Sequence, residues 1–153
     1  MEEKAQISAP QTVYNLNGIT LLEVKFGRQN TFEPITDAKT VHQKTIINVT
    51  HTDLSKPTFT TFLMVEYTVT QINSQEPIMS VSVVQSATFN RGGAPSDKDL
   101  KMFANINAPA IIFPFSREII ASLTAKSLLG TVLLHPVNFV QLYEDTLAKE
   151  AKK

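Results

Sequence analysis

The sequence predicts an α+β fold in which a four-stranded antiparallel sheet is followed by helices that pack on one of its faces. Two observations indicate this class. Apolar and polar side chains alternate with a period of two through residues 41–90, whereas apolar spacings of three and four dominate the C-terminal third. A run of strands followed by a run of helices is typical of α+β proteins, with the helices gathered on one side of the sheet.

Size and composition favour one ordinary globular domain. The chain has 153 residues, 42% of them hydrophobic, so a single domain spanning 1–153 is expected. Lys plus Arg and Asp plus Glu each number 14, so no net field would attract nucleic acid or an anionic membrane. The absence of cysteine excludes disulfides and thiolate chemistry. With neither a signal segment nor an apolar run of roughly 18 residues, a soluble, cytoplasmic protein without membrane insertion is expected.

Four strands are expected. The first covers about 19–26, where the apolar alternation is less clean than in the other three, and each of those three carries its apolar side chains at odd positions. Polar joins ending in proline, at 53–57 and 73–77, are typical of hairpin loops. One face of this sheet is therefore apolar and the other is wet. The odd-position residues are Val41, Thr45, Ile47 and Val49, then Phe59, Leu63, Val65, Tyr67 and Val69, then Met79, Val81, Val83, Ala87 and Phe89.

Two helical segments follow the strands. Ser96 with Asp99 three residues later resembles a capping box, which predicts a short helix over about 97–105. Pro109 fits the first turn of a second helix, where its missing amide hydrogen costs nothing, and Pro114 then predicts a kink or a second start. The apolar stripe expected for this helix consists of Ile112, Phe115, Ile119 and Leu123.

The segment 128–136 ends that helix and remains apolar without a clear period. Connections are usually polar and exposed, so this one either packs as core or lines a groove for apolar ligands, and its composition alone favours core. Pro136 is expected to open the last helix. The stripe of that helix is Val137, Val140, Tyr143 or Glu144, and Leu147, and its C-terminal cations are Lys149, Lys152 and Lys153.

Residues that could carry chemistry are sparse. The three histidines have no partner at metal-ligand spacing, and Gly92-Gly93 is too short to cradle a phosphate. No nucleophile elbow surrounds Ser116 or Ser122. We therefore expect neither an enzyme nor a bound metal or cofactor.

The C-terminal third resembles a known family. Residues Pro109, Ile112, Phe113, Pro114, Phe115, Arg117 and Glu118 are similar to the P-x-x-I/L-F-P-Y/F-x-R-E signature of the bacterial protein-export chaperone SecB. Residues 136–139 are similar to the P-V-N-F motif of that family, and weaker matches cover 23–26 and 85–89. The resemblance implies a four-stranded sheet, a long kinked helix, a crossover loop and a C-terminal helix, assembled as a homotetramer that is a dimer of dimers.

The function implied by the resemblance is that of an ATP-independent holdase. Such a protein binds unfolded or precursor polypeptides in hydrophobic grooves and passes them to the motor ATPase of the Sec export pathway. The resemblance also shifts the expectation for the crossover loop, 128–135, from core toward groove wall. The groove residues that it implies are Met79, Val83, Phe115, Ile119, Leu128, Leu129, Val132, Leu133, Leu134 and Leu147.

The acidic positions that the family uses to meet the motor are only partly present. Glu23 retains one of them, but Gly27 and Ser82 stand where the family has glutamates, and the chain ends in AKEAKK instead of an acidic tail. A neutral chain with a basic end should attract the basic surfaces of the motor less. The alternative is a chaperone or interaction protein of the same fold that serves one partner, for example an antitoxin, without coupling to the motor.

Overall fold

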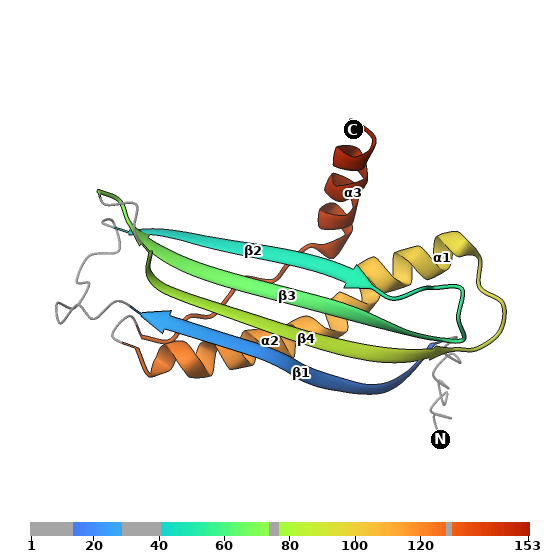
Figure 1. The fold of residues 1–153 in the computed structure, drawn as a ribbon, viewed down its shortest axis with the longest axis horizontal. Helices are drawn as coiled ribbons and strands as arrows, with labels where there is room; N and C mark the ends of the chain where they lie inside the picture. The colour runs from blue at the N-terminus through green and yellow to red at the C-terminus, as the bar shows by residue number, and fades with distance from the viewer. Residues whose placement is uncertain (1–13, 29–40, 74–76, 128–129) are drawn as a thin grey trace, which may run out of the picture.

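A computed structural model of the protein describes residues 14–28, 41–73, 77–127 and 130–153. Its strands form one antiparallel sheet in the order β1-β4-β3-β2, and α1 and α2 lie across one face of that sheet while α3 projects past the β2 edge (Figure 1). The α+β class is therefore confirmed. The elements are β1 (Tyr14–Arg28), β2 (Val41–His51), β3 (Thr58–Gln71), β4 (Pro77–Arg91), α1 (Asp97–Met102), the π-helical segment η2 (Phe103–Asn107), α2 (Ala108–Ala125) and α3 (Phe139–Glu150).

The core lies between the two central strands and the helices. Burial alternates strictly along β3, and the odd positions of β3 and β4 face α1, η2 and α2, as the period of two predicted. Phe59 and Phe89 stack at one end of this core with ring centroids 5.7 Å apart, and Phe103 of η2 meets Phe89 edge to face at 5.0 Å. The even positions form the outer, solvent-facing side of the sheet.

The first strand is longer than expected and contains two register shifts. One lies between Leu16 and Gly18 and the other between Leu21 and Glu23, so that Leu22 is left without a partner on β4. Each extra residue moves the following side chains to the other face of the strand. For this reason the apolar alternation of residues 19–26 is irregular in the sequence although the strand itself is continuous.

The helical part is one run in which a π-helical segment separates two α-helices. Ser96 caps α1 as expected, accepting from the Asp99 amide at 3.1 Å, while its hydroxyl donates to the Asp99 carboxylate at 2.7 Å. Pro109 lies at the start of α2, directly after η2. The helix does not start again at Pro114, which lies inside α2, so the departure from regular α-helix occurs earlier than the prolines suggested.

The face of α2 that packs on the sheet differs from the expected stripe. Ile112 is buried, but the stripe continues through Ser116 and Ile120, whereas Phe115 is 50% exposed. In a regular helix, Leu100 and Ile112 would lie about 120° apart, because twelve residues advance about 100° each. The wider turn at η2 takes up one residue and brings both onto the sheet. That extra residue sets which side of α2 is buried.

The last helix begins later than predicted. Asn138 is its N-cap, and its side chain accepts from the Gln141 amide at 3.1 Å. Pro136 therefore lies in the connection, outside the helix, because the asparagine two residues later satisfies the free amide groups of the first turn. Within the described ranges, no helix is both long and apolar enough to cross a membrane.

Candidate functional site

The structure places two expected groove residues in the core. Met79 and Val83 on β4 are 1% and 0% exposed, since α2 covers the face to which they point. In this chain they support the sheet–helix interface and offer no accessible wall. A peptide on the surface could reach them only if α2 moved away from the sheet.

In the described part of the crossover loop, buried residues alternate with exposed ones. Leu133 is 64% exposed, while Leu134 beside it is 5% exposed and Val132 is half-buried. The Val132 amide donates to Thr124 Oγ1 at 2.8 Å, and this buried hydroxyl donates to the Ile120 carbonyl at 2.7 Å, which ties the loop to the end of α2. The described part of this segment thus contains buried and exposed apolar residues side by side. The expectations for Leu128 and Leu129 lie outside the described residues.

A pocket of about 440 Å³ opens between the crossover loop and the β2 side of the sheet, and we call it the loop pocket. Phe113 forms part of its wall and meets Phe139 edge to face at 5.9 Å, which holds the start of α3 against α2. Burial raises the pKa of the Tyr67 hydroxyl in this pocket, so the group stays protonated and neutral. The lining is Gln43, Thr45, Ile47, Tyr67, Phe113, Val132, Leu133, Leu134, His135, Pro136, Val137 and Leu142.

Sequence reasoning found the loop residues of this pocket but not its sheet and helix residues. Ile47 and Tyr67 belong to the apolar face that the period of two predicts for their strands, and both line the pocket. They line a pocket because α2 covers β4 and β3, which leaves the β2 side of the same face open (Figure 1). The alternation of apolar and polar residues predicts which face of a strand points inward. It does not predict whether a helix covers that face.

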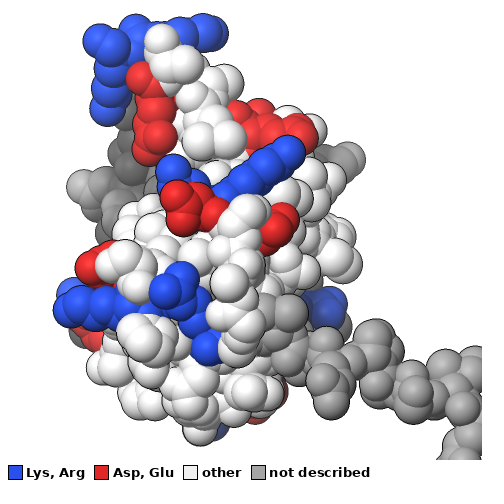
Figure 2. Space-filling model, turned by 90° about the vertical axis from the view of Figure 1, so that its right-hand side faces the viewer, with Lys and Arg blue, Asp and Glu red and all other residues white. Residues whose placement is uncertain are grey.

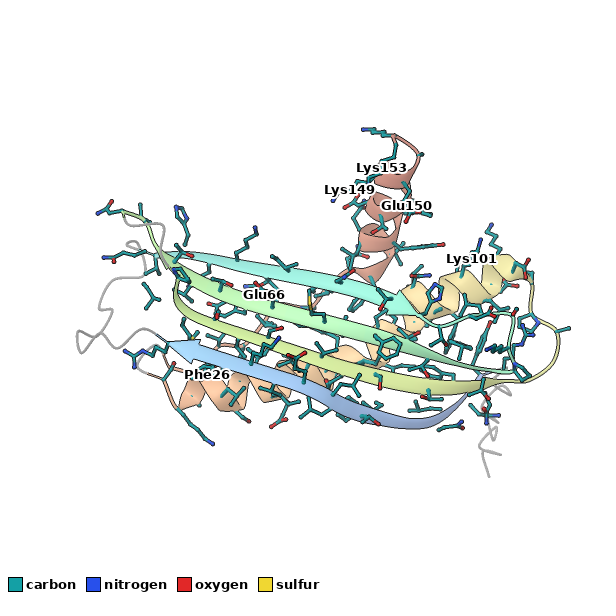
Figure 3. All side chains as sticks on the ribbon, viewed as in Figure 1. Phe26, Glu66, Lys101, Lys149, Glu150 and Lys153 are labelled. Atoms are coloured by element: carbon teal, nitrogen blue, oxygen red, sulfur yellow. The ribbon has the colours of Figure 1, made fainter. Side chains whose placement is uncertain are left out.

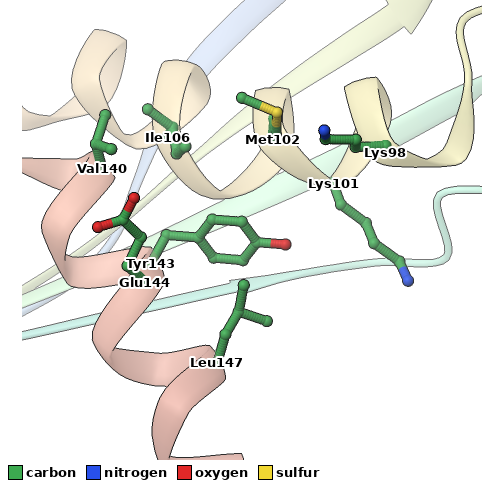
Figure 4. Close-up of a pocket in the computed structure, with 8 residues that line it drawn as sticks. All are labelled: Lys98, Lys101, Met102, Ile106, Val140, Tyr143, Glu144 and Leu147. Atoms are coloured by element: carbon green, nitrogen blue, oxygen red, sulfur yellow. The ribbon is translucent and has the colours of Figure 1, made fainter.

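A second hollow, of about 480 Å³, lies between α1–η2 and α3, and we call it the helix groove. Figure 4 shows the Tyr143 ring reaching across it from α3 toward α1, with Leu147 below the ring. Of the expected site residues that the structure describes, only Leu147 lines it. Its other α3 residues belong to the apolar stripe that the sequence predicts for the last helix, whereas its residues on α1 and η2 have no such signal. The lining is Lys98, Lys101, Met102, Ile106, Val140, Tyr143, Glu144 and Leu147.

Two further expected groove residues lie elsewhere on α2. Ile119 is half-buried and Phe115 half-exposed, and neither lines the loop pocket or the helix groove. The expected site residues are therefore distributed over the core, the loop pocket, the helix groove and the free side of α2. A single chain does not bring them into one groove.

The outer face of the sheet carries Glu23. Its carboxylate pairs with the Lys25 ammonium at 2.5 Å, and this hydrogen bond, together with the charge of Glu23, raises the pKa of Lys25. Ser82 on β4 lies between Lys25 on β1 and Glu66 on β3, and Figure 3 shows Glu66 within the sheet. The charge of Glu23 is therefore partly offset by its own neighbour. No cluster of three or more metal-binding side chains occurs among the residues that the structure describes.

A four-stranded antiparallel sheet carrying a long helix and a C-terminal helix, with open apolar hollows beside the last helix, defines a SecB-like fold. The structure is similar to that of a SecB-like chaperone of Mycobacterium tuberculosis, solved in complex with a peptide from an antitoxin. The TM-score is 0.66 at 14% identity, and the match covers 81% of this chain and 90% of that one. A family model described as "Preprotein translocase subunit SecB" matches residues 8–150, so the chain belongs to the SecB family.

Curated relatives agree with this membership. The "Protein-export protein SecB" of Afipia carboxidovorans is 31% identical over 107 residues, which are 70% of this chain and 65% of the relative. That of Methylobacillus flagellatus is 31% identical over 90 residues, which are 59% of this chain and 57% of the relative. The match to each thus spans less than two thirds of the relative's own length. The SecB family is one of chaperones and not of enzymes.

Proposed function

We propose that the protein is an ATP-independent chaperone that holds non-native polypeptides in the loop pocket and the helix groove. The observation that supports this proposal is apolar surface left open beside a well-formed core. Leu133, Val140 and Leu147 are about half exposed or more, and they lie at open hollows next to α3. Exposed apolar concavities of this kind mark binding sites.

The chemistry of an unfolded client fits these hollows. Such a client presents apolar side chains in no fixed order, so its site must be apolar, adaptable and extended. Met102 in the helix groove has a flexible thioether side chain that can adapt to different shapes. Each apolar contact contributes only about 25 cal/mol per Å² of buried area, so tight holding requires contacts at several places along the client. The loop pocket and the helix groove, one on each side of α3, supply these contacts.

The direct test is suppression of aggregation. We expect the purified protein to slow the aggregation of a chemically unfolded client at stoichiometric amounts without ATP, measured by light scattering. A triple variant with Leu133→Gln, Val140→Gln and Leu147→Gln should lose most of this effect while keeping its circular dichroism spectrum. The matched control is Ile46→Gln, which removes an exposed apolar side chain from the opposite face of the sheet. Equal holding by the triple variant and the control would refute the assignment of these hollows.

Assembly as a dimer of dimers is also part of the proposal. Among the described strands the outer edge of β1 is unpaired, and Leu21, Val24 and Phe26, which lie opposite inward-facing residues of β4, stay about 40–50% exposed. An open strand edge with apolar side chains favours pairing with another chain. Multi-angle light scattering should give four times the chain mass of 17.0 kDa, and a monomer at micromolar concentration would exclude the tetramer.

Two alternatives remain for the clients of this chaperone. It either delivers many precursors to the Sec motor ATPase or binds one dedicated partner protein. The offset charge of Glu23, with Gly27 and Ser82 at the other acidic positions of the family, favours the dedicated partner. Two measurements separate the alternatives. Micromolar or tighter binding to the motor ATPase, with many precursors recovered by pull-down, supports export, whereas recovery of one partner without motor binding supports the dedicated role.

A further inference from the structure

The helix groove has unlike charges at its two ends. Lys98 and Lys101 extend from α1 at one end, while the Glu144 carboxylate lies beside Val140 at the other end (Figure 4). Within the described part of the chain, none of these three side chains forms an ion pair. Two cations and one anion are thus available to a ligand, and the Lys98 and Lys101 side chains leave α1 in different directions (Figure 4).

The two acids nearest the lysine end form no ion pair with it among the described residues. Asp99 follows Lys98 on α1, but its carboxylate accepts from the Ser96 hydroxyl at the helix cap and does not line the groove. Lys101 also lines an adjoining hollow between the end of β2 and α3, and Glu150 lines that hollow too. Figure 2 shows basic and acidic side chains lying next to one another over this side of the molecule.

Between the charged ends the groove is apolar. Met102 and Ile106 face Val140 and Leu147 across it, and the volume of about 480 Å³ admits one or two large side chains. An apolar occupant next to two unpaired ammonium groups is stabilised if it brings a carboxylate, because that charge then pairs without leaving water completely.

From this geometry we propose that the helix groove prefers client segments in which a bulky apolar residue is flanked by an acidic residue. The apolar side chain lies on Met102 and Leu147, and the carboxylate of a flanking residue lies at Lys98 or at Lys101. The inference rests on the proposed holdase function and adds to it a class of client: non-native segments with mixed apolar and acidic character.

Three fluorescent peptides test this preference. They share one apolar core, for example Leu-Phe-Leu, flanked on both sides by Glu, Gln or Lys, and their binding is followed by fluorescence anisotropy with the full chain. We expect the Glu-flanked peptide to bind about two- to fivefold more tightly than the Lys-flanked one at about 0.1 M salt, the range for one or two exposed charge pairs. The difference should vanish near 1 M salt, where screening acts within about 3 Å.

Two exposed, charge-neutralising variants should shift the preference in opposite directions. The double substitution Lys98→Gln and Lys101→Gln should remove the preference for Glu flanks, and Glu144→Gln should increase it. Lys149→Gln, at the end of α3 outside the groove, is the control and should leave the ratio unchanged. The Gln-flanked peptide should bind all four proteins alike, which shows that the apolar part of the groove is intact.

The outcomes separate this inference from the proposed function. Equal binding of the three peptides, together with normal suppression of aggregation, would overturn the charge preference and leave the holdase standing. Failure to bind any peptide, together with no suppression of aggregation, would overturn the holdase itself. If the lysine variant lowered the assembled mass in light scattering without changing the peptide ratio, the groove would be an interface with a second copy and the inference would be wrong.

Discussion

Ser116 and Thr61 place buried hydrogen bonds within the apolar helix–sheet interface. The Ser116 hydroxyl donates to Gln85 Oε1 on β4 at 2.5 Å, and the Thr61 hydroxyl on β3 donates to the Ala104 carbonyl in η2 at 3.2 Å. All three side chains are at most 4% exposed. Because a buried polar group costs free energy unless it is paired, these bonds specify one position of the helical run on the sheet.

Substitution of Ser116 should therefore lower the free energy of unfolding strongly, although it removes only one hydroxyl group. Ser116→Ala leaves the Gln85 side chain buried without its donor, and we expect the free energy of unfolding to fall by about 1–3 kcal/mol in urea titration. The control is Ser122→Ala, which removes an exposed hydrogen bond to Glu118 on the same helix and should cost less than about 0.5 kcal/mol. Equal losses of unfolding free energy in the two variants would mean that the buried hydrogen bond contributes no more to stability than the exposed one.

Single residues also show how far a site can be read from a sequence. Leu133 and Leu147 were expected at a groove and do line hollows, since an apolar side chain in a connection or on a sparsely packed helix often stays exposed. Met79 and Val83 were expected there as well, but α2 covers them. The difference depends on a helix that begins 25 residues after Val83 in the chain, which no local pattern contains.

The run α1–η2–α2 depends on its π-helical segment. Leu100, Ala104, Ala108, Ile112, Ser116 and Ile120 follow one another at intervals of four and are all buried. In a regular helix such a row would drift by about 40° at each step. The segment η2 takes up one residue, and Pro109, which cannot donate a backbone hydrogen bond, lies two residues after its end.

Removing one residue from the π-helical segment should be tolerated. Deletion of Asn107, combined with Pro109→Ala so that no proline ring lies within a regular helix, leaves Leu100 and Ile112 eleven residues apart and on one face. We expect its free energy of unfolding to lie within about 1 kcal/mol of that of the Pro109→Ala variant alone. Deletion of Glu118 in the same background should lower the free energy of unfolding by about 2–5 kcal/mol. It rotates Ile120 by about 100° around the helix axis and thus removes this side chain from the core. Tolerance of both deletions would contradict the register argument.

The last helix is weakly attached to the rest of the chain. Phe139 is its only buried residue, and hollows lie on both sides of it. Elements with few buried contacts open locally at low free energy. Hydrogen exchange followed by mass spectrometry should therefore show faster exchange in α3 than in β3, and Phe139→Ala should speed exchange in α3 while leaving β3 unchanged. Equal protection of α3 and β3 would show that contacts beyond Phe139 hold the helix.

At the level of the whole molecule, charge separates this chain from the acidic pattern that the family resemblance implies. Its net formal charge is zero. The outer sheet face has room for the missing acids: a Cβ added at Gly27 would lie 3.8 Å from Ser80 Oγ, an ordinary contact. Ser82 lies on the same face, opposite Lys25 and Glu66. Steric fit therefore does not explain the loss of these acids.

Restoring the acids should strengthen any attraction to the Sec motor. We expect Gly27→Glu with Ser82→Glu to increase binding to the motor ATPase at low salt, measured by surface plasmon resonance, with the gain falling as salt rises. Asn48→Glu with Thr50→Glu adds the same charge to β2 on the same face and is the control. Equal gains in the two variants would indicate attraction by net charge without a defined docking position.

Local patterns were sufficient for the fold class, the strand faces, the cap at Ser96 and the position of Pro109, because each depends on residues a few positions apart. Contacts between distant segments were needed for the rest. They set which side of α2 is buried, so that Phe115 faces outward and Met79 is covered. They also leave the β2 side of the sheet and the sides of α3 open as hollows. The physical reason is that one extra residue at η2 rotates the whole of α2, and the accessibility of each apolar side chain follows from that rotation.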